Sequence, residues 1–310
     1  MDRIYLDWNA TAPTLPSVRE AMVEALEGVP GNASSIHQHG QRARALVEEA
    51  RRALASAVGA PGQSVVLTGG ATESNNQVLR SHVHREESPA ILCTAVEHPS
   101  VLEVVERLGG EGVEVDVTPV DDAGRLDLDW LEARLAEGVT LVSAMWANNE
   151  IGNIYPVEKI AEIAHEHGAL LHVDATQAFG RVPVDFAASG ADMMTLSFHK
   201  MGGPKGIGAV VLREGQKVES LMAGGHQERG RRPGTENVPA AAGLRRAARE
   251  VEAEIEAWNE TLERKRRDFL AALEEAVPEF SHRGDAERRI PNTLNLAFPG
   301  VDGEDFLLAL

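Results

Sequence analysis

Short apolar runs rich in β-branched residues alternate along the chain with longer segments in which apolar positions recur every three or four residues. The short runs predict strands and the longer segments predict amphipathic helices. The predicted strands are residues 64–68, 90–96, 113–120, 140–146, 169–175, 192–198 and 207–212. Several helical segments between them end on glycine, which commonly terminates helices. This alternation predicts an α/β fold with a mainly parallel, seven-stranded sheet sandwiched by helices.

One long helix is predicted after the last of these strands. Residues 238–277 are an almost unbroken series of helix formers, which Pro278 ends. One strand at 293–298 and the opening of a helix at 303–310 follow, too little to close a second hydrophobic core. A helix of this length commonly bridges two lobes of a protein.

The long helix divides the predicted structure into two domains. We expect a large ligand-binding domain at residues 14–250 and a small domain formed by residues 1–13 and 251–310. Because the small domain holds so few elements, we expect the chain to stop inside it.

Composition and charge exclude several classes of function. Of the 310 residues, 43% are hydrophobic, and 30 basic against 48 acidic side chains give a net charge of −18. That charge disfavours nucleic acid and anionic membranes, so a small molecule or a protein is the expected partner. The single cysteine, Cys93, excludes an internal disulfide and a cysteine-ligated metal site. With no signal sequence and no apolar run of roughly 18 residues, the chain is expected to be cytoplasmic.

Polar side chains and glycines follow five of the predicted strands. Because parallel strands end at the same edge of a sheet, where ligands bind, we expect these residues to converge. The glycine turn in TGGATESNN leads into a helix whose N–H groups can hold a phosphate, with the Thr72 hydroxyl beside them. In chain order the converging residues are Gly69, Gly70, Ala71, Thr72, Glu97, His98, Asn148, Asn149, Glu150, Asp174, Gln177, Ser197, His199 and Lys200.

Two of these residues indicate a particular cofactor. Asp174 ends a hydrophobic strand, where a carboxylate is costly unless it pairs with a cation such as a protonated pyridine nitrogen. Lys200 follows another apolar strand, where desolvation lowers the pKa of its amine and favours imine formation with an aldehyde. Pyridoxal phosphate requires a lysine Schiff base, an acidic partner for its ring nitrogen and a phosphate cradle, so it is the predicted cofactor. His98 could stack on the ring and exchange protons.

Other residues have simpler interpretations. Lys205, in GPKG, is the rival imine former, but it lies within a turn and is expected to be solvated. Cys93 lies inside an apolar strand and is expected to be a buried, inert thiol. Three histidine pairs are spaced two residues apart and face different sides of a helix, so they are expected at the surface and no metal site is predicted. These pairs are His37/His39, His82/His84 and His165/His167.

Seven segments of the sequence together resemble a known family. They are YLDWNATAP, GATESNN, EHPSV, NNEIG, HVDATQ, SFHKMGGPKGIG and GGHQERGRRPGTEN. In this order they resemble the cysteine desulfurases of the NifS/IscS type, within the class V aminotransferase-like enzymes of pyridoxal phosphate fold type I. The resemblance covers nearly the whole chain.

The resemblance implies roles for the residues at the sheet edge. Lys200 would carry the cofactor as a Schiff base, with Lys200 and His98 as the catalytic residues. Asp174 would pair with the pyridine nitrogen and Gln177 with the ring hydroxyl. The further implied cofactor residues are Ala71, Thr72, Ser197 and His199 around the phosphate, Asn149 lining the site, and Thr235, which reaches the phosphate of the neighbouring subunit and so implies a homodimer.

The implied reaction removes sulfur from L-cysteine, releases L-alanine and passes the sulfur as a persulfide to an acceptor protein, in iron–sulfur cluster or thio-cofactor supply. The freed Lys200 or His98 would take the Cα proton. Two alternatives stay open: another class V activity, such as selenocysteine lyase or aminotransferase, and a non-catalytic dimerisation or assembly partner. In the family, the sulfur-accepting cysteine and an arginine for the substrate carboxylate follow the segment matching 293–310. We therefore expect either a fragment of a longer enzyme or a natural truncation.

Overall fold

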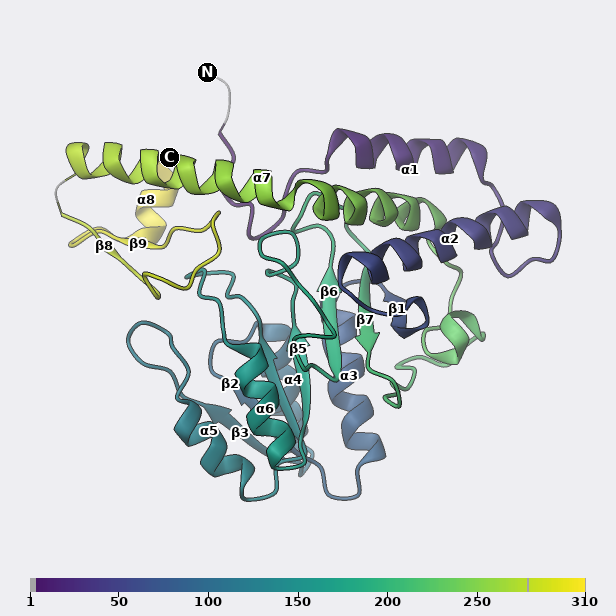
Figure 1. The fold of residues 1–310 in the computed structure, drawn as a ribbon, viewed down its shortest axis with the longest axis horizontal. Coiled ribbons are helices and arrows are strands. Elements are labelled where there is room, and N and C mark those ends of the chain that lie inside the picture. Colours follow the sequence, from purple (N-terminus) through teal and green to yellow (C-terminus); the bar gives the residue numbers. More distant parts are fainter. Residues whose placement is uncertain (1–3, 278, 310) are drawn as a thin grey trace.

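A seven-stranded sheet with the order β1-β7-β6-β5-β4-β2-β3 forms the centre of the structure, a computed structural model that describes residues 4–277 and 279–309 (Figure 1). Strand β7 pairs antiparallel with β1 and β6, and the other pairs are parallel. Since two antiparallel steps restore the direction, β1 ends at the same edge as β2, β4, β5 and β6. The predicted strands and the mainly parallel sheet are confirmed. The strands are β1 (Val65–Thr68), β2 (Ala90–Thr94), β3 (Glu114–Thr118), β4 (Leu141–Met145), β5 (Leu170–Asp174), β6 (Met193–Ser197) and β7 (Gly208–Leu212).

Helices cover both faces of this sheet and create two hydrophobic cores. One core lies between the sheet and α2, α5, α6 and α7, and the other lies between the opposite face and α3 and α4. The helices are α1 (Pro16–Gly28), α2 (Gln38–Ala57), α3 (Ala71–Arg85), α4 (Pro99–Gly110), α5 (Leu128–Leu135), α6 (Val157–Glu166), α7 (Val238–Ala276) and α8 (Gly303–Ala309), with 3-10 turns η1 (Gly62–Ser64) and η2 (Gln227–Gly230).

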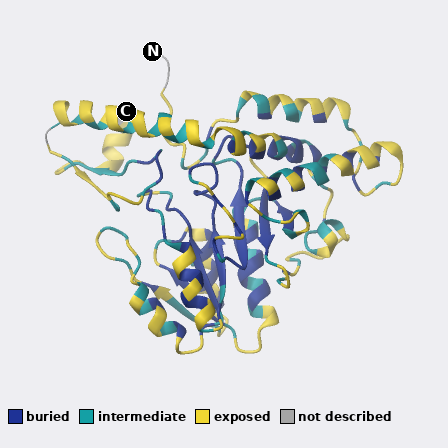
Figure 2. Ribbon diagram, in the orientation of Figure 1, coloured by how far each residue is buried: buried dark blue, intermediate teal, exposed yellow. Residues whose placement is uncertain are grey.

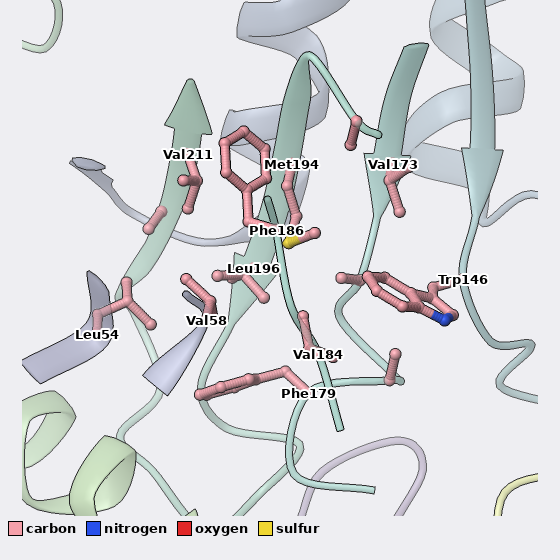
Figure 3. Packing of buried hydrophobic residues seen from close by; sticks show 14 of the residues in the cluster. Leu54, Val58, Trp146, Val173, Phe179, Val184, Phe186, Met194, Leu196 and Val211 are labelled. Carbon is pink, nitrogen blue, oxygen red and sulfur yellow. The ribbon is translucent and has the colours of Figure 1, made fainter. Parts of the chain in front are cut away.

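Neighbouring residues of one strand enter opposite cores. In β6, Met193 belongs to the core under α3 and α4, whereas Met194 and Leu196 belong to the larger core on the other face. Figure 3 shows Leu196 close to Val58 and Val184 in that larger core. Buried residues accordingly fill the central strands (Figure 2). A sheet covered on both faces explains why most of its strands are largely apolar runs in the sequence, whereas the edge strand β3 alternates acidic and apolar residues.

Helix α7 connects this sheet to the C-terminal segment. Its first part is buried against α1 and α2, and after Val251 it carries no buried residue. Its exposed part extends over a two-stranded antiparallel ribbon, β8 (Ser281–His282) and β9 (Leu296–Ala297), and over α8 (Figure 1). The long helix, the strand near residue 296 and the last helix were all predicted. Strand β8 was missed because two residues are too few to show an alternating pattern.

No helix among the described residues combines the length and the hydropathy needed to cross a lipid bilayer.

Leu196→Ala tests the larger core. Leu196 is fully buried on β6, so we expect the substitution to lower the free energy of unfolding by about 2–5 kcal/mol. Urea denaturation followed by circular dichroism measures this change. Leu26→Ala is the matched control, since Leu26 is 65% exposed and should change stability by no more than about 0.5 kcal/mol. Equal effects of the two substitutions would contradict this packing.

Candidate active site

A cavity of about 620 Å³ opens where β1, β2, β4, β5 and β6 end. The structure brings most predicted site residues together here, although they come from five separate segments. Thr235 lies elsewhere: it lines a second cavity beside Arg232 and Asn237. Its expected contact with a neighbouring subunit stays a prediction. The predicted residues that line the first cavity are Ala71, Thr72, His98, Asn149, Asp174, Gln177, Ser197, His199 and Lys200.

Asp174 is the last residue of β5, and its side chain is only 5% exposed. Its Oδ1 accepts a hydrogen bond from the Thr176 N–H at 2.9 Å, and its Oδ2 accepts one from Asn75 Nδ2 at 2.8 Å. Among the described residues, no basic side chain forms an ion pair with this carboxylate. A buried carboxylate with neutral partners is suited to a ligand that brings its own positive charge.

Lys200 lies three residues beyond the end of β6, facing the N-terminal segment. Its Nζ donates hydrogen bonds to the backbone oxygens of Asn9 at 2.7 Å and Ala10 at 2.9 Å. Burial lowers the pKa of the Lys200 amine, and the charge of Asp174 opposes part of that shift. Arg181 donates to the Lys200 carbonyl at 2.6 Å and so fixes its backbone. The amine is therefore held in place and is easier to deprotonate than a surface lysine.

Lys205 also lines the cavity, which its place in a turn did not reveal. Its side chain is exposed, as predicted. Lys200, by contrast, is partly buried.

The N-terminus of α3 forms the opposite side of the cavity. Gly70, its N-cap, has φ 152°, which residues with a side chain rarely adopt, and no side chain caps this end. A Cβ atom at Gly208 of β7 would lie 2.7 Å from the Gly70 Cα, so the close approach of β7 to this turn requires glycine. Glu73 accepts from the Gly69 N–H at 2.9 Å and pairs with Arg232 at 3.0 Å. The helix N–H groups are thus available to an anion, and Arg232 offsets the nearest acidic charge.

Three further predicted residues present polar atoms to the cavity. Gln177 Nε2 donates to the Asn9 carbonyl at 2.8 Å, while its buried Oε1 has no partner among the described residues. His199 Nδ1 lies 3.1 Å from Thr11 Oγ1, and burial lowers the His199 pKa to about 4, so its ring is neutral near pH 7. His98 is the N-cap of α4, where its Nδ1 accepts from the Ser100 N–H at 3.1 Å.

Three residues expected at this edge do not line the cavity. Asn148 is buried and organises the following turn by accepting from the N–H groups of Glu150 and Ile151. Glu97 is buried beneath the strand ends, where its Oε1 accepts from Thr94 Oγ1 at 2.7 Å and from the Met145 N–H at 2.5 Å. The prediction that Glu97, Asn148 and Glu150 share the cavity rim is therefore wrong, because alternate residues after a strand point away from the ligand.

Glu97→Gln should change the pH dependence of stability. Burial raises the pKa of Glu97 from 4.5 to about 8. The folded state then keeps its proton to a higher pH than the unfolded chain, so this residue lowers the free energy of unfolding progressively between about pH 4.5 and pH 8. Glutamine does not titrate, and it can still accept from Met145. Across that pH range, we expect the free energy of unfolding of the variant to rise relative to that of wild type by at least about 1.4 kcal/mol, which corresponds to one pKa unit. If urea denaturation gave wild type and Glu97→Gln the same pH dependence of stability, the raised pKa of Glu97 would be disproved.

The histidines and Cys93 were interpreted in part correctly. Cys93 is fully buried in β2, as predicted, and burial raises its thiol pKa to about 12. His82 is not at the surface: it is buried and lies 2.8 Å from Thr140 Oγ1. His165 is partly exposed and lies 2.9 Å from Asp192 Oδ2.

Several residues of this site were given no role from the sequence. Asn9 is the centre of one group. Its Nδ2 donates to the Asn149 carbonyl and to Thr293 Oγ1, and its backbone oxygen accepts a hydrogen bond from Lys200 Nζ. Asn75 and Ser100 form a second group behind Asp174 and His98. All these residues lie in or near the segments YLDWNATAP, GATESNN and EHPSV. They were missed because none of them directly follows a strand.

The fold and site combine a sheet of this order with an amine, a buried carboxylate and a helix N-terminus at one edge. The sequence matches the aminotransferase class-V family over residues 4–310. It is 44% identical over 314 residues to a cysteine desulfurase of Sinorhizobium fredii, and this alignment covers 99% of this chain and 81% of that protein. It is 39% identical over 312 residues to cysteine desulfurase NifS of Azotobacter vinelandii, covering 100% and 78%. The structure of a NifS-like protein has a TM-score of 0.94 at 34% identity, covering 98% of this chain and 84% of that one. The chain belongs to the cysteine desulfurase family.

Proposed function

We propose that this chain catalyses the removal of sulfur from L-cysteine with pyridoxal phosphate as cofactor. L-cysteine and an acceptor thiol would give L-alanine and a persulfide: the Cβ–Sγ bond breaks, an S–S bond forms, and a proton goes to Cβ. The observation that carries the proposal is the Lys200 amine in one cavity with the buried Asp174 carboxylate and the uncapped end of α3. The desulfurase relatives support it over selenocysteine lyase, aminotransferase and a non-catalytic role.

The residues of the cavity fit this cofactor. Lys200 would hold its aldehyde carbon, Asp174 its ring nitrogen, and the N-terminus of α3 with Thr72 its phosphate. The Gln177 Oε1 atom and the Asp174 carboxylate are buried with polar capacity left over for a ligand. When bound, pyridoxal phosphate supplies an electron sink that stabilises negative charge at the substrate carbons. The remaining cofactor residues in this proposal are Ala71, His98, Asn149, Ser197, His199 and, from the neighbouring subunit, Thr235.

Lys200 and Asp174 would then move protons and balance charge during the reaction. The backbone oxygens of Asn9 and Ala10 hold the Lys200 amine when it is free, so it would stay within the cavity after substrate has displaced it. Because burial lowers its pKa, Lys200 can reach the neutral form that accepts a proton from the substrate Cα. Asp174, buried at the end of β5, would pair with a positive charge on the cofactor ring.

The sulfur-accepting thiol would not be Cys93. Its side chain is fully buried in the core under α3 and α4, does not line the cavity, and has a thiol pKa near 12. The thiolate is the reactive form, and burial removes both the thiolate and access to substrate. Cys93 is also the only cysteine of the 310 residues. We propose that the sulfur passes to a different thiol, and from it to an acceptor protein.

We further propose a cytoplasmic homodimer with a large domain at residues 14–250 and a small domain at 1–13 and 251–310. Thr235 supports the dimer, because it lies outside the cavity of its own chain. The exposed second part of α7 supports the domain boundary.

The proposal is tested with purified protein loaded with pyridoxal phosphate, L-cysteine, and dithiothreitol as the acceptor thiol. L-alanine and sulfide are expected in equal amounts. Imine absorbance without either product would overturn the proposal and favour the non-catalytic role. Preference for L-selenocysteine, or amino transfer to a 2-oxo acid without sulfide, would favour the other class V activities.

A further inference from the structure

A hydrogen-bonded chain of buried side chains joins His98 to Asp174. His98 Nδ1 accepts from the Ser100 N–H at 3.1 Å and lies 2.9 Å from Ser100 Oγ. A backbone N–H can only donate, so Nδ1 must offer its lone pair. The proton of the neutral imidazole is therefore on Nε2.

Asn75 fixes the direction of this chain. Its Nδ2 lies 2.8 Å from Asp174 Oδ2 and 2.9 Å from Ser100 Oγ. The nitrogen must face the carboxylate, because the amide oxygen there would set two acceptors against each other. One N–H of Asn75 thus goes to Asp174 and the other to Ser100. The Ser100 hydroxyl accepts from Asn75 and has its own hydrogen free for His98 Nδ1.

The two connecting side chains are shielded from water, although His98 itself is exposed. Asn75 is fully buried at 0% exposure, and Ser100 is 8% exposed. Asn75 belongs to the first turns of α3 and Ser100 to the first turn of α4, so two helices that pack on the same sheet face supply the connection. Water cannot easily replace Asn75 or Ser100 in these hydrogen bonds, so the packing of the two helices determines the orientation of His98.

We propose that Asn75 and Ser100 are positioning residues that hold His98 with its proton on Nε2 and couple its orientation to Asp174. The inference deepens the proposed function and rests on it for its effect on turnover. In this arrangement neutral His98 enters the cavity as a hydrogen-bond donor. Its Nε2–H can donate a hydrogen bond to the substrate, but His98 cannot accept a proton at Nε2.

The first test uses the protein without cofactor, so its outcome is independent of the desulfurase activity. Long-range ¹H–¹⁵N NMR of histidine-labelled protein reports which ring nitrogen carries the proton, with His98→Gln assigning the signal. We expect Nε2–H and an unprotonated Nδ1 in wild type. A proton on Nδ1 would overturn the proposal.

Variants test the two positioning residues. In Ser100→Ala and Asn75→Ala the backbone N–H at position 100 still faces Nδ1, so we expect Nε2–H to persist while the His98 signals shift and broaden because the ring orientation loosens. Ser100→Thr keeps the hydroxyl and should restore the wild-type signals. Asn76→Ala is the matched control, because Asn76 follows Asn75 on α3 but bonds only to the Thr72 carbonyl of its own helix. Unchanged His98 signals in both alanine variants would refute the positioning role.

Kinetics supply the second readout. With cofactor and L-cysteine, we expect Ser100→Ala to lower kcat by about 10-fold to 100-fold while KM stays within about twofold, as for residues that orient a catalytic group. A rise in KM alone would show that Ser100 shapes substrate binding and would contradict the proposal. Loss of folding is excluded by comparing urea denaturation of each variant with that of wild type.

Discussion

Lys200→Ala is expected to abolish the visible imine absorbance of the protein with pyridoxal phosphate and to lower turnover by about 10³-fold or more. The substitution removes a cavity amine whose pKa is lowered by burial, and with it both the imine and a proton acceptor for the substrate Cα. Absorption spectra after removal of free cofactor, together with L-alanine production, measure the two effects.

Two lysine variants serve as controls for this experiment. Lys205→Ala removes the other cavity lysine, and we expect it to retain the imine absorbance because Lys205 is exposed. Lys159→Ala removes a surface lysine on α6 that pairs with Glu162, and it should retain both absorbance and turnover. If Lys205→Ala lost the absorbance while Lys200→Ala kept it, the assignment of the two lysines would be reversed.

Asp174→Asn is expected to retain part of the cofactor binding but to lower kcat by about 10²-fold to 10³-fold. A neutral amide no longer favours a positive charge on the ligand. The NH₂ group of this amide would also have to face one of the two donors that the carboxylate accepts from, either Asn75 Nδ2 or the Thr176 N–H. Two donors would then face each other in a buried place. Cofactor titration gives the dissociation constant, and steady-state L-alanine formation gives kcat.

Asp192→Asn is the matched control for a buried carboxylate. Asp192 precedes β6 at the opposite edge of the sheet, where it accepts from the Leu171 N–H at 2.9 Å. We expect this variant to lose stability but to keep its kcat. Undiminished turnover in Asp174→Asn would contradict the ring-nitrogen role, and an equal loss in both variants would show that any buried charge is required.

The sheet was predictable because most strands are apolar runs bounded by a turn or a helix, as in residues 141–145 and 193–197, and because β3 alternates acidic and apolar residues. The direction of β7 was not predictable, since an apolar run such as Gly208–Leu212 fits a parallel and an antiparallel strand equally well. Only its pairing with β1 and β6, which are distant in sequence, determines that direction.

The cavity was predictable to the extent that its residues follow strands. Asp174, Lys200 and the turn before α3 were found by that rule. Asn9 was not, because the N-terminal segment has no strand, and its place beside Lys200 depends on long-range contacts with Thr293 and Asn149. Asn75 and Ser100 were hidden within helices, where a buried polar residue does not reveal its partner.

The contacts of Asn9 span almost the entire polypeptide: Lys200 is 191 positions away and Thr293 is 284 positions away. Closing loops of such length is slow, so these contacts should form near the end of folding. The free Lys200 amine would therefore gain its backbone hydrogen-bond acceptors only late in folding. Newly made protein should pass through a stage in which the sheet exists but this amine still lacks them.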